Sequence, residues 1–168
     1  FTYQCDGKQL IHYKKLIKKP TFVSIVNNHS LDYGIQSHKN TKKFLKKYNF
    51  YCNSKNKSES KDIIFFNSSD HCGCDNKELW SQHISLFDYQ NTKHILEKIK
   101  NLRSKTKKII IYSIHWGSNW VKDSMPPHIQ NFARNLIDAG VTIVFGHSAH
   151  HIVKNPIEEY NNGIIIYG

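Results

Sequence analysis

Three histidines crowd one short stretch near the end of the chain. His147, His150 and His151 lie in GHSAHHI (146–152), which directly follows the apolar run VTIVF (141–145). Imidazole binds Zn, Fe, Mn or Ni, and it also transfers protons near neutral pH. Three explanations therefore compete: a metal site, acid–base chemistry, or coincidence in a sequence that contains 11 histidines.

Three more clusters of polar residues follow apolar runs that we expect to be strands. They are Asn27, Asn28, His29 and Asp32 after 21–26, Asp70 and His71 after 62–67, and His115 at the end of 108–114. In open α/β sheets, ligands bind outside the carboxyl ends of the strands. We therefore expect the four clusters to converge on one crevice and to form a metal-centred hydrolytic site.

Each cluster also has an ordinary interpretation. A histidine after a strand is commonly a surface or hydrogen-bonded residue, and the pair Asn27-Asn28 is typical of a turn. The coincidence of four clusters favours the metal site, because imidazole nitrogens and an amide oxygen can share one coordination shell.

Hydrophobic periodicity predicts alternating strands and helices. The expected strands are 21–26, 62–67, 108–114, 141–145 and 163–167, and the expected helices are 37–48, 91–103 and 126–140. Two helix faces follow from the spacing: Phe44, Leu45 and Tyr48 in one helix, and Ile95, Ile99 and Leu102 in the next. Apolar strands separated by helices predict an α/β sandwich, with residues 1–168 in a single domain.

The chain is strongly basic, with a formal net charge of +11. Such a charge is compatible with a nucleic-acid-binding domain, because lysine and arginine neutralise phosphates. Only Arg103 and Arg134 among the 24 basic residues are arginines, and the lysines are spread in pairs along the chain. We therefore interpret the charge as a solvated, lysine-rich surface with a secondary attraction for anionic substrates.

The cysteines and the apolar runs exclude several classes of protein. Cys5, Cys52, Cys72 and Cys74 are too few for a disulfide framework in 168 residues, so we expect reduced, structural thiols. HCGC (71–74) resembles half of a zinc site, but the sequence holds no matching half. No run approaches the roughly 20 apolar residues of a membrane span, and no signal-peptide pattern opens the sequence.

Five separated segments carry a family resemblance. They are NNHSLDYG (27–34), SIHWGSNW (113–120), LIDAG (136–140), VFGHSAHHI (144–152) and PIEEYNNGIIIYG (156–168). In this order they resemble the CapA-like family, which is associated with poly-γ-glutamate capsule synthesis, within the calcineurin-like metallophosphoesterase superfamily. The resemblance implies a four-layer αββα sandwich around two divalent metal ions, which would be Mn, Fe or Zn.

The resemblance also implies roles for individual residues. Asn28, His115, His147 and His150 match metal ligands, although two residues separate His147 from His150 where the phosphatase pattern has one. His151 is therefore an alternative ligand to His150.

His29 and Asp32 are the candidate catalytic residues. His29 corresponds to the acid that protonates the leaving group. We expect Asp32, three residues later, to orient His29 or to cap the following helix.

The sequence departs from the family at both ends. A Gly-Asp strand end and an Asn-Leu-Glu segment normally come first, and their carboxylates complete the metal site. Neither motif precedes the matched segments, and relatives continue beyond Tyr167-Gly168. We therefore expect these residues to be the central and C-terminal part of a larger catalytic domain.

Three functions remain open at this stage. The first is a metal-dependent hydrolase or transferase acting on a phosphoester, an acyl phosphate or a polyglutamate amide. The second is a non-catalytic protein that binds an anionic polymer such as poly-γ-glutamate, and the third is a nucleic-acid-binding domain. The resemblance implies the cell envelope or the extracytoplasmic face as the location, and the sequence gives no indication of oligomeric state.

Overall fold

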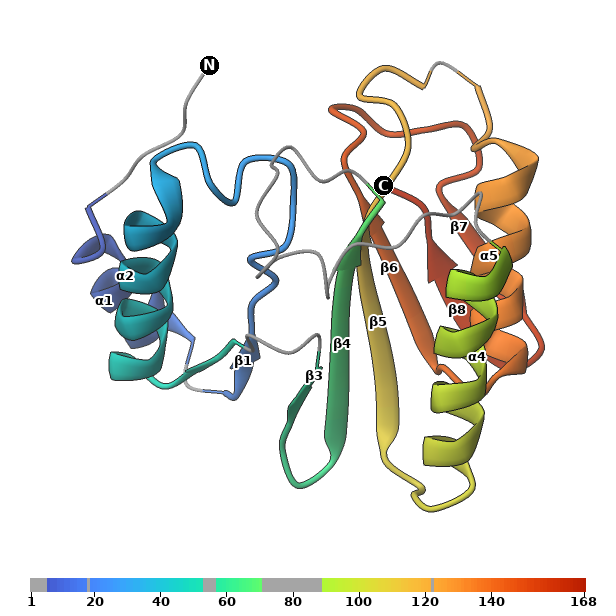
Figure 1. Ribbon diagram of the computed structural model, residues 1–168, viewed down its shortest axis with the longest axis horizontal. Helices are drawn as coiled ribbons and strands as arrows, with labels where there is room; N and C mark the ends of the chain where they lie inside the picture. Colours follow the sequence, from blue (N-terminus) through green and yellow to red (C-terminus); the bar gives the residue numbers. More distant parts are fainter. Residues whose placement is uncertain (1–5, 18, 53–56, 71–88, 122) are drawn as a thin grey trace.

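The computed structural model describes residues 6–17, 19–52, 57–70, 89–121 and 123–168 (Figure 1). Its helices are α1 (Gln9–Leu16), α2 (Gly34–Lys47), α4 (Tyr89–Arg103) and α5 (Pro127–Asp138). Its strands are β1 (Thr21–Phe22), β2 (Phe50–Tyr51), β3 (Lys57–Glu59), β4 (Ile63–Ser69), β5 (Ile109–His115), β6 (Ile143–His147), β7 (Ile157–Tyr160) and β8 (Gly163–Ile166). The chain is thus a mixed α/β protein, as the sequence predicts.

The larger of two sheets has six strands in the order β3-β4-β5-β6-β8-β7. Its central strands β4, β5, β6 and β8 are parallel, and β3 and β7 pair antiparallel at the two edges. The pairing places Ser69, His115 and His147 opposite one another at the carboxyl ends of β4, β5 and β6. Parallel pairing therefore brings the ends of these three strands to one edge of the sheet.

One face of this sheet packs on α4 and α5 and forms the main core. Alternate residues of the central strands point to this face, because successive side chains of a strand lie on opposite sides. They are Ile64, Phe66, Ile110, Tyr112, Ile114, Val144 and Ile165, all buried with Ile99 of α4 and Ile129, Phe132 and Leu136 of α5. Burial of these side chains stabilises the fold and fixes which residues of each strand face the other way.

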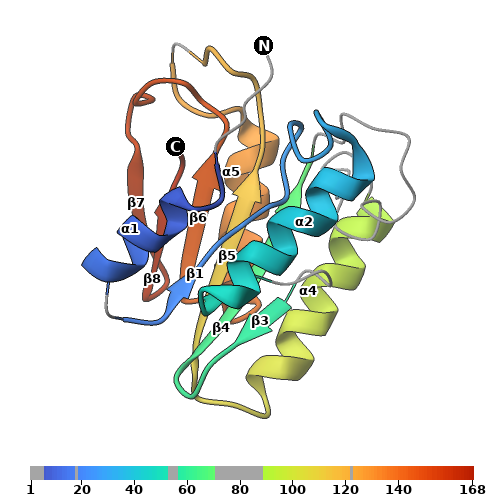
Figure 2. The same ribbon diagram turned by 90° about the vertical axis from the view of Figure 1, so that its left-hand side faces the viewer.

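The N-terminal layer lies over the opposite face of the sheet and contacts it at β4. Phe22 of β1 stacks on Phe65 of β4 with ring centroids 5.4 Å apart. Figure 2 shows β1, α1 and α2 in front of the six-stranded sheet, so the layers run in the order helices, small sheet, large sheet, helices. Phe145 and Ile164 on this face remain 45% and 42% exposed.

The predicted elements agree with the structure except in the N-terminal third. The strand predicted at 21–26 is wrong beyond Phe22, because its partner β2 is itself two residues long. The last backbone contact of this pairing is the hydrogen bond from Val23 N–H to Tyr51 O at 3.0 Å. In α2, Leu45 is buried but Phe44 is exposed, so the predicted face is only partly correct. Ile99 is buried and Ile95 and Leu102 pack against the core, as expected for α4.

Both arginines make internal contacts. Arg103 Nε donates to the Gly140 carbonyl at 2.8 Å, just past the end of α5, and its Nη1 donates to Lys108 O at 2.9 Å. Arg134 Nε lies 2.7 Å from Glu158 Oε1. The two side chains suited to bidentate phosphate binding therefore tie secondary-structure elements together.

Among the described residues, no helix is long enough and apolar enough to cross a membrane.

Gly146 lies against the fully buried indole of Trp116, whose Nε1 donates to Tyr167 O at 3.1 Å. A Cβ at position 146 would lie 2.6 Å from Trp116 Cε2. We expect Gly146→Ala to lower the free energy of unfolding by about 1–3 kcal/mol, the usual cost of overpacking a core. Urea denaturation measures the change.

Trp116→Phe provides the control for this steric explanation. A smaller ring makes room for the added methyl group, so the double variant should lose less stability than the sum of the two single variants. Additive losses would show that the Trp116 indole is not the group that excludes a methyl group at position 146.

Candidate functional site

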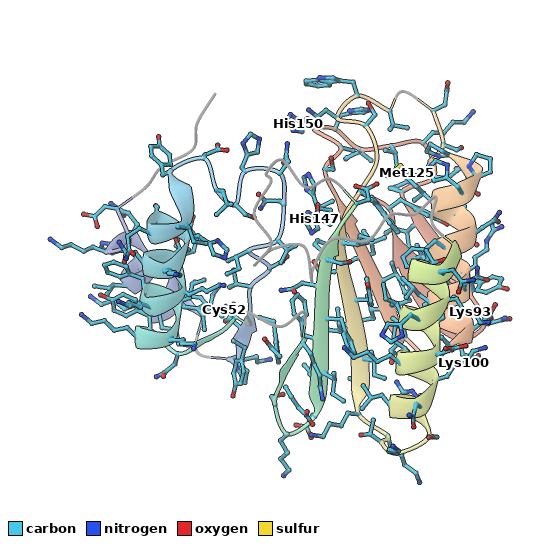
Figure 3. The ribbon with its side chains drawn as sticks, in the orientation of Figure 1. Cys52, Lys93, Lys100, Met125, His147 and His150 are labelled. Atoms are coloured by element: carbon cyan, nitrogen blue, oxygen red, sulfur yellow. The ribbon has the colours of Figure 1, made fainter. Side chains whose placement is uncertain are left out.

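Two of the predicted ligands, His115 and His147, end adjacent parallel strands and are in contact. Their Nδ1 atoms lie 3.2 Å apart, and their ring centroids are 5.2 Å apart. Figure 3 shows His147 at the carboxyl end of the large sheet, towards the segment that follows β1. The in-register pairing of β5 and β6 therefore assembles an imidazole pair at the expected edge.

The environment keeps the His147 imidazole neutral. Burial lowers the pKa of His147 to about 4, because removal from water disfavours the charged ring. Its Nε2 lies 3.2 Å from Ser113 Oγ, on the same face of β5 as His115. A neutral imidazole has one nitrogen lone pair, which can accept a hydrogen bond or bind a cation.

The segment after β1 forms a turn that holds His29. Ser30 Oγ donates to Ile25 O at 2.7 Å, and the His29 amide donates to Asn27 Oδ1 at 2.8 Å. His29 Nδ1 lies 2.8 Å from Asp32 Oδ2, with the two side chains 40% and 17% exposed. α2 begins without a side-chain cap, so of the two roles expected for Asp32 the contact present is the one with His29.

Asn28 is the ligand candidate from this turn. Its Oδ1 is buried and has no hydrogen-bond partner. A buried amide oxygen without a partner costs free energy, and a bound cation or donor would satisfy it.

Two further residues shape the same edge. Asp70 donates its backbone N–H to His115 O at 2.9 Å, and its Oδ2 accepts the Gly117 N–H at 3.0 Å. Ser148 directly follows His147 and has a φ of 126°, in the region that favours glycine. Backbone strain of this kind costs on the order of 1–3 kcal/mol and concentrates at functional sites.

His150 and His151 lie apart from this pair, against an exposed tryptophan. Trp120 is 65% exposed, and its ring centroid lies 5.2 Å from that of His150 and 6.1 Å from that of His151. His151 Nε2 also contacts the Val121 carbonyl. Figure 3 shows His150 beyond His147 at the end of the molecule, so the two are at the same edge but in different surroundings.

Sequence reasoning missed Asn67 and Ser113, which lie opposite each other on β4 and β5. Asn67 is 1% exposed, and neither of its side-chain polar atoms has a hydrogen-bond partner. Ser113 contacts His147, as described above. The signal in the sequence was the polar run NSS (67–69) at the end of an otherwise apolar strand.

Of the four cysteines, Cys52 lies among the residues that the structure describes. Cys5, Cys72 and Cys74 lie outside the described residues, as does His71. Cys52 is a free thiol, and burial is the main cause that raises its pKa, which matches the expected reduced, structural role.

The edge presents neutral donors and one carboxylate, that of Asp70, whose Oδ2 accepts the Gly117 N–H. Within the described ranges, no group of three or more His, Cys, Asp or Glu side chains is arranged to hold a metal. His115 and His147 supply two imidazoles in contact, and Asn28 Oδ1 is a buried amide oxygen without a hydrogen-bond partner. Imidazole nitrogens and amide oxygens are both ligand types that divalent cations accept.

The fold and the histidine pair define an α/β protein whose site lies at the carboxyl ends of parallel strands. The chain belongs to the bacterial capsule synthesis protein family PGA_cap, whose model matches residues 51–168. The family resemblance inferred from the sequence motifs is thereby confirmed.

Curated relatives agree with this family. PGA biosynthesis protein CapA of Bacillus subtilis is 30% identical over 99% of the chain and 48% of its own length. Capsule biosynthesis protein CapA of Bacillus anthracis is 25% identical over 88% of the chain and 38% of its own length. A probable polyglutamine synthesis accessory protein of Mycobacterium tuberculosis is 50% identical over 36% of the chain. The chain therefore spans about half or less of these relatives, and no solved structure matches it.

Asn67 provides a test of whether the site trades stability for ligand binding. Replacing the buried amide by leucine of similar size removes two polar atoms that have no partner. We expect Asn67→Leu to leave the free energy of unfolding unchanged or to raise it by about 1 kcal/mol. Urea denaturation without added metal measures this change.

The matched control is Asn131→Leu, at an exposed position of α5. It should shift stability by less than about 0.5 kcal/mol. A loss of more than about 1 kcal/mol at position 67 would mean that the amide is satisfied in solution.

Proposed function

We propose that this protein is a metal-dependent hydrolase or transferase of poly-γ-glutamate capsule synthesis. The observation that carries the proposal is the contact of His115 and His147 at the in-register ends of β5 and β6. Membership of the capsule synthesis family and the name of the Bacillus subtilis relative support the polymer. The scissile group in this proposal is a phosphoester, an acyl phosphate or an amide of the glutamyl chain.

Asn28, His115 and His147 form the proposed ligand set for a divalent cation, Mn, Fe or Zn. A bound cation would stabilise negative charge that develops on the reacting group. We leave His150 out of this set, because its exposed ring packs against Trp120. A second cation would need further ligands, and carboxylates suit it best because they offset its charge.

His29 is the proposed acid of the reaction. The carboxylate of Asp32 holds the imidazole through Nδ1, at 2.8 Å. In the protonated ring, Nδ1–H donates to the carboxylate and Nε2–H is positioned to give its proton to a departing oxygen, which leaves a neutral imidazole. The His29 side chain is 40% exposed, which makes the imidazole accessible to a substrate.

The proposed function goes with a metallophosphoesterase-like αββα sandwich as the fold of the protein. The order of layers in Figure 2 supports it, since helices lie outside a small and a large sheet. The apolar side chains Phe145 and Ile164 support a larger second sheet over the open part of this face. The location in this proposal is the cell envelope or the extracytoplasmic face.

A non-catalytic polymer-binding protein is the second candidate. Among the residues that the structure describes, no three His, Cys, Asp or Glu side chains are grouped to hold a metal, and this favours the second candidate. For a nucleic-acid-binding domain, the internal contacts of Arg103 and Arg134 argue against phosphate recognition by these residues.

Metal content tests the proposed ligand set. The protein is equilibrated with Mn²⁺ or Zn²⁺, dialysed and measured by elemental analysis. We expect His147→Ala to retain less metal than the parent, because a lost imidazole opens a coordination position. His150→Ala is the matched control and should keep the content of the parent. Equal content in all three proteins would remove His147 from the set.

Leaving-group dependence tests the role of His29. We expect His29→Ala to slow hydrolysis of an alkyl phosphate by about 10²–10⁴-fold, the usual contribution of general acid catalysis. A nitrophenyl phosphate should lose much less, because its leaving group departs without a proton.

Asp32→Asn keeps the imidazole but weakens its positioning, so its loss should be smaller than that of His29→Ala. Equal slowing of both esters by His29→Ala would reject the acid role. Absence of turnover by the parent, with metal bound, would favour the polymer-binding protein.

A further inference from the structure

The positive charge of the chain is concentrated in its first third. Residues 1–52 contain ten lysines and two aspartates, a net +8, whereas residues 53–168 contain 14 basic and 11 acidic residues, a net +3. The sequence alone shows only scattered lysine pairs. The fold gathers them, because α1 and α2 together form one outer layer of the molecule (Figure 1).

The lysines of α2 form a stripe along one face of the helix. Lys39, Lys43, Lys46 and Lys47 are exposed and occupy positions i, i+4, i+7 and i+8. This spacing puts them on the same side, since an α-helix has about 3.6 residues per turn. Leu45 packs inward from another side of the helix.

Three lysines of this stripe lack a neighbouring carboxylate in the described part of the chain. Lys43, Lys46 and Lys47 have no carboxylate partner among the residues that the structure describes. By contrast, Glu59 of β3, in the large sheet, forms ion pairs with Lys57 and Lys108 at 2.9 and 2.6 Å. Like charges one turn apart destabilise a helix by a few tenths of a kcal/mol, so a polyanion bound along the stripe would relieve repulsion.

The stripe also leads to the proposed site. α2 begins at Gly34, two residues after Asp32, which holds His29. In the shared orientation of Figures 1 and 3, α2 runs away from the end of the molecule at which His147 and His150 lie. At about 1.5 Å per residue, the 14 residues of α2 span about 21 Å.

We propose that the lysine stripe of α2 binds poly-γ-glutamate and positions the chain toward His29. The inference rests on the proposed function, which supplies the polymer. Poly-γ-glutamate carries one carboxylate per residue, and a row of ammonium groups attracts such a chain without requiring a fixed geometry at each contact. Duplex DNA fits less well, because the layer contains no arginine.

Binding of a fluorescently labelled poly-γ-glutamate oligomer, followed by anisotropy, tests this surface. We expect the triple variant Lys43→Gln, Lys46→Gln and Lys47→Gln to bind about tenfold more weakly at low ionic strength, from the sum of three exposed ion pairs. The affinity of the parent should also fall more steeply with salt than that of the variant. Circular dichroism checks that the helix is retained, since glutamine is a good helix former.

The control removes the same charge from α4, the helix on the far side of the large sheet. Lys93→Gln, Lys98→Gln and Lys100→Gln change exposed residues, two of which are labelled in Figure 3. This variant should bind the oligomer within about twofold of the parent, because α4 lies on the opposite side of the large sheet from α2 (Figure 1). Equal weakening by both triple variants would overturn the proposal in favour of net charge alone.

A duplex DNA oligomer of equal charge provides the second comparison. Tighter binding of DNA than of poly-γ-glutamate, lost in the α2 variant, would overturn the proposal and assign the surface to nucleic acid. Failure of the parent to bind poly-γ-glutamate would also overturn it. Metal content and ester turnover of the same α2 variant separate the two proposals, because both should stay at parental values if only the polymer surface is changed.

Discussion

The register of β4, β5 and β6 is the constraint on which the rest of the site depends. Because side chains alternate along a strand, a slip of one residue would turn His115 or His147 toward α4 and α5. Apolar residues that alternate with the histidines along β5 and β6 prevent such a slip. Ile114 and Val144 are fully buried on the helix-covered face, and moving them to the open face would expose them to water. Packing on one side of the sheet therefore positions the imidazoles on the other.

The same edge contains several features that reduce stability. Asn28 Oδ1 and the Asn67 amide are buried without partners, and Ser148 has a left-handed backbone directly after His147. The core behind them is tightly packed, since Gly146 has no space for a methyl group beside Trp116. Polar groups without partners and backbone strain persist where a rigid scaffold holds them, and they concentrate at sites that bind or react.

The two halves of the chain supply different parts of the proposed chemistry. The C-terminal half supplies the parallel strands and the imidazole pair, whereas the N-terminal layer supplies Asn28, the His29–Asp32 pair and the concentrated positive charge. These layers meet at β1, where Phe22 stacks on Phe65. Contact between the layers therefore determines how the acid and the lysine stripe lie relative to the imidazoles.

The sequence by itself determined the family and, among the described elements of the C-terminal half, every helix and strand except β7. Long apolar runs and helical spacing fix strands such as 108–114 locally, and the motif around His147 is specific in its order of residues. Only the tertiary structure decided that His115 meets His147, that His150 packs on Trp120 instead, and that Asn67 is buried without a partner. The physical reason is that such contacts depend on strand register and on which face of each strand is covered, and neither is a property of a local segment. The short strand β1 failed as a prediction for the same reason, since its length depends on its partner strand.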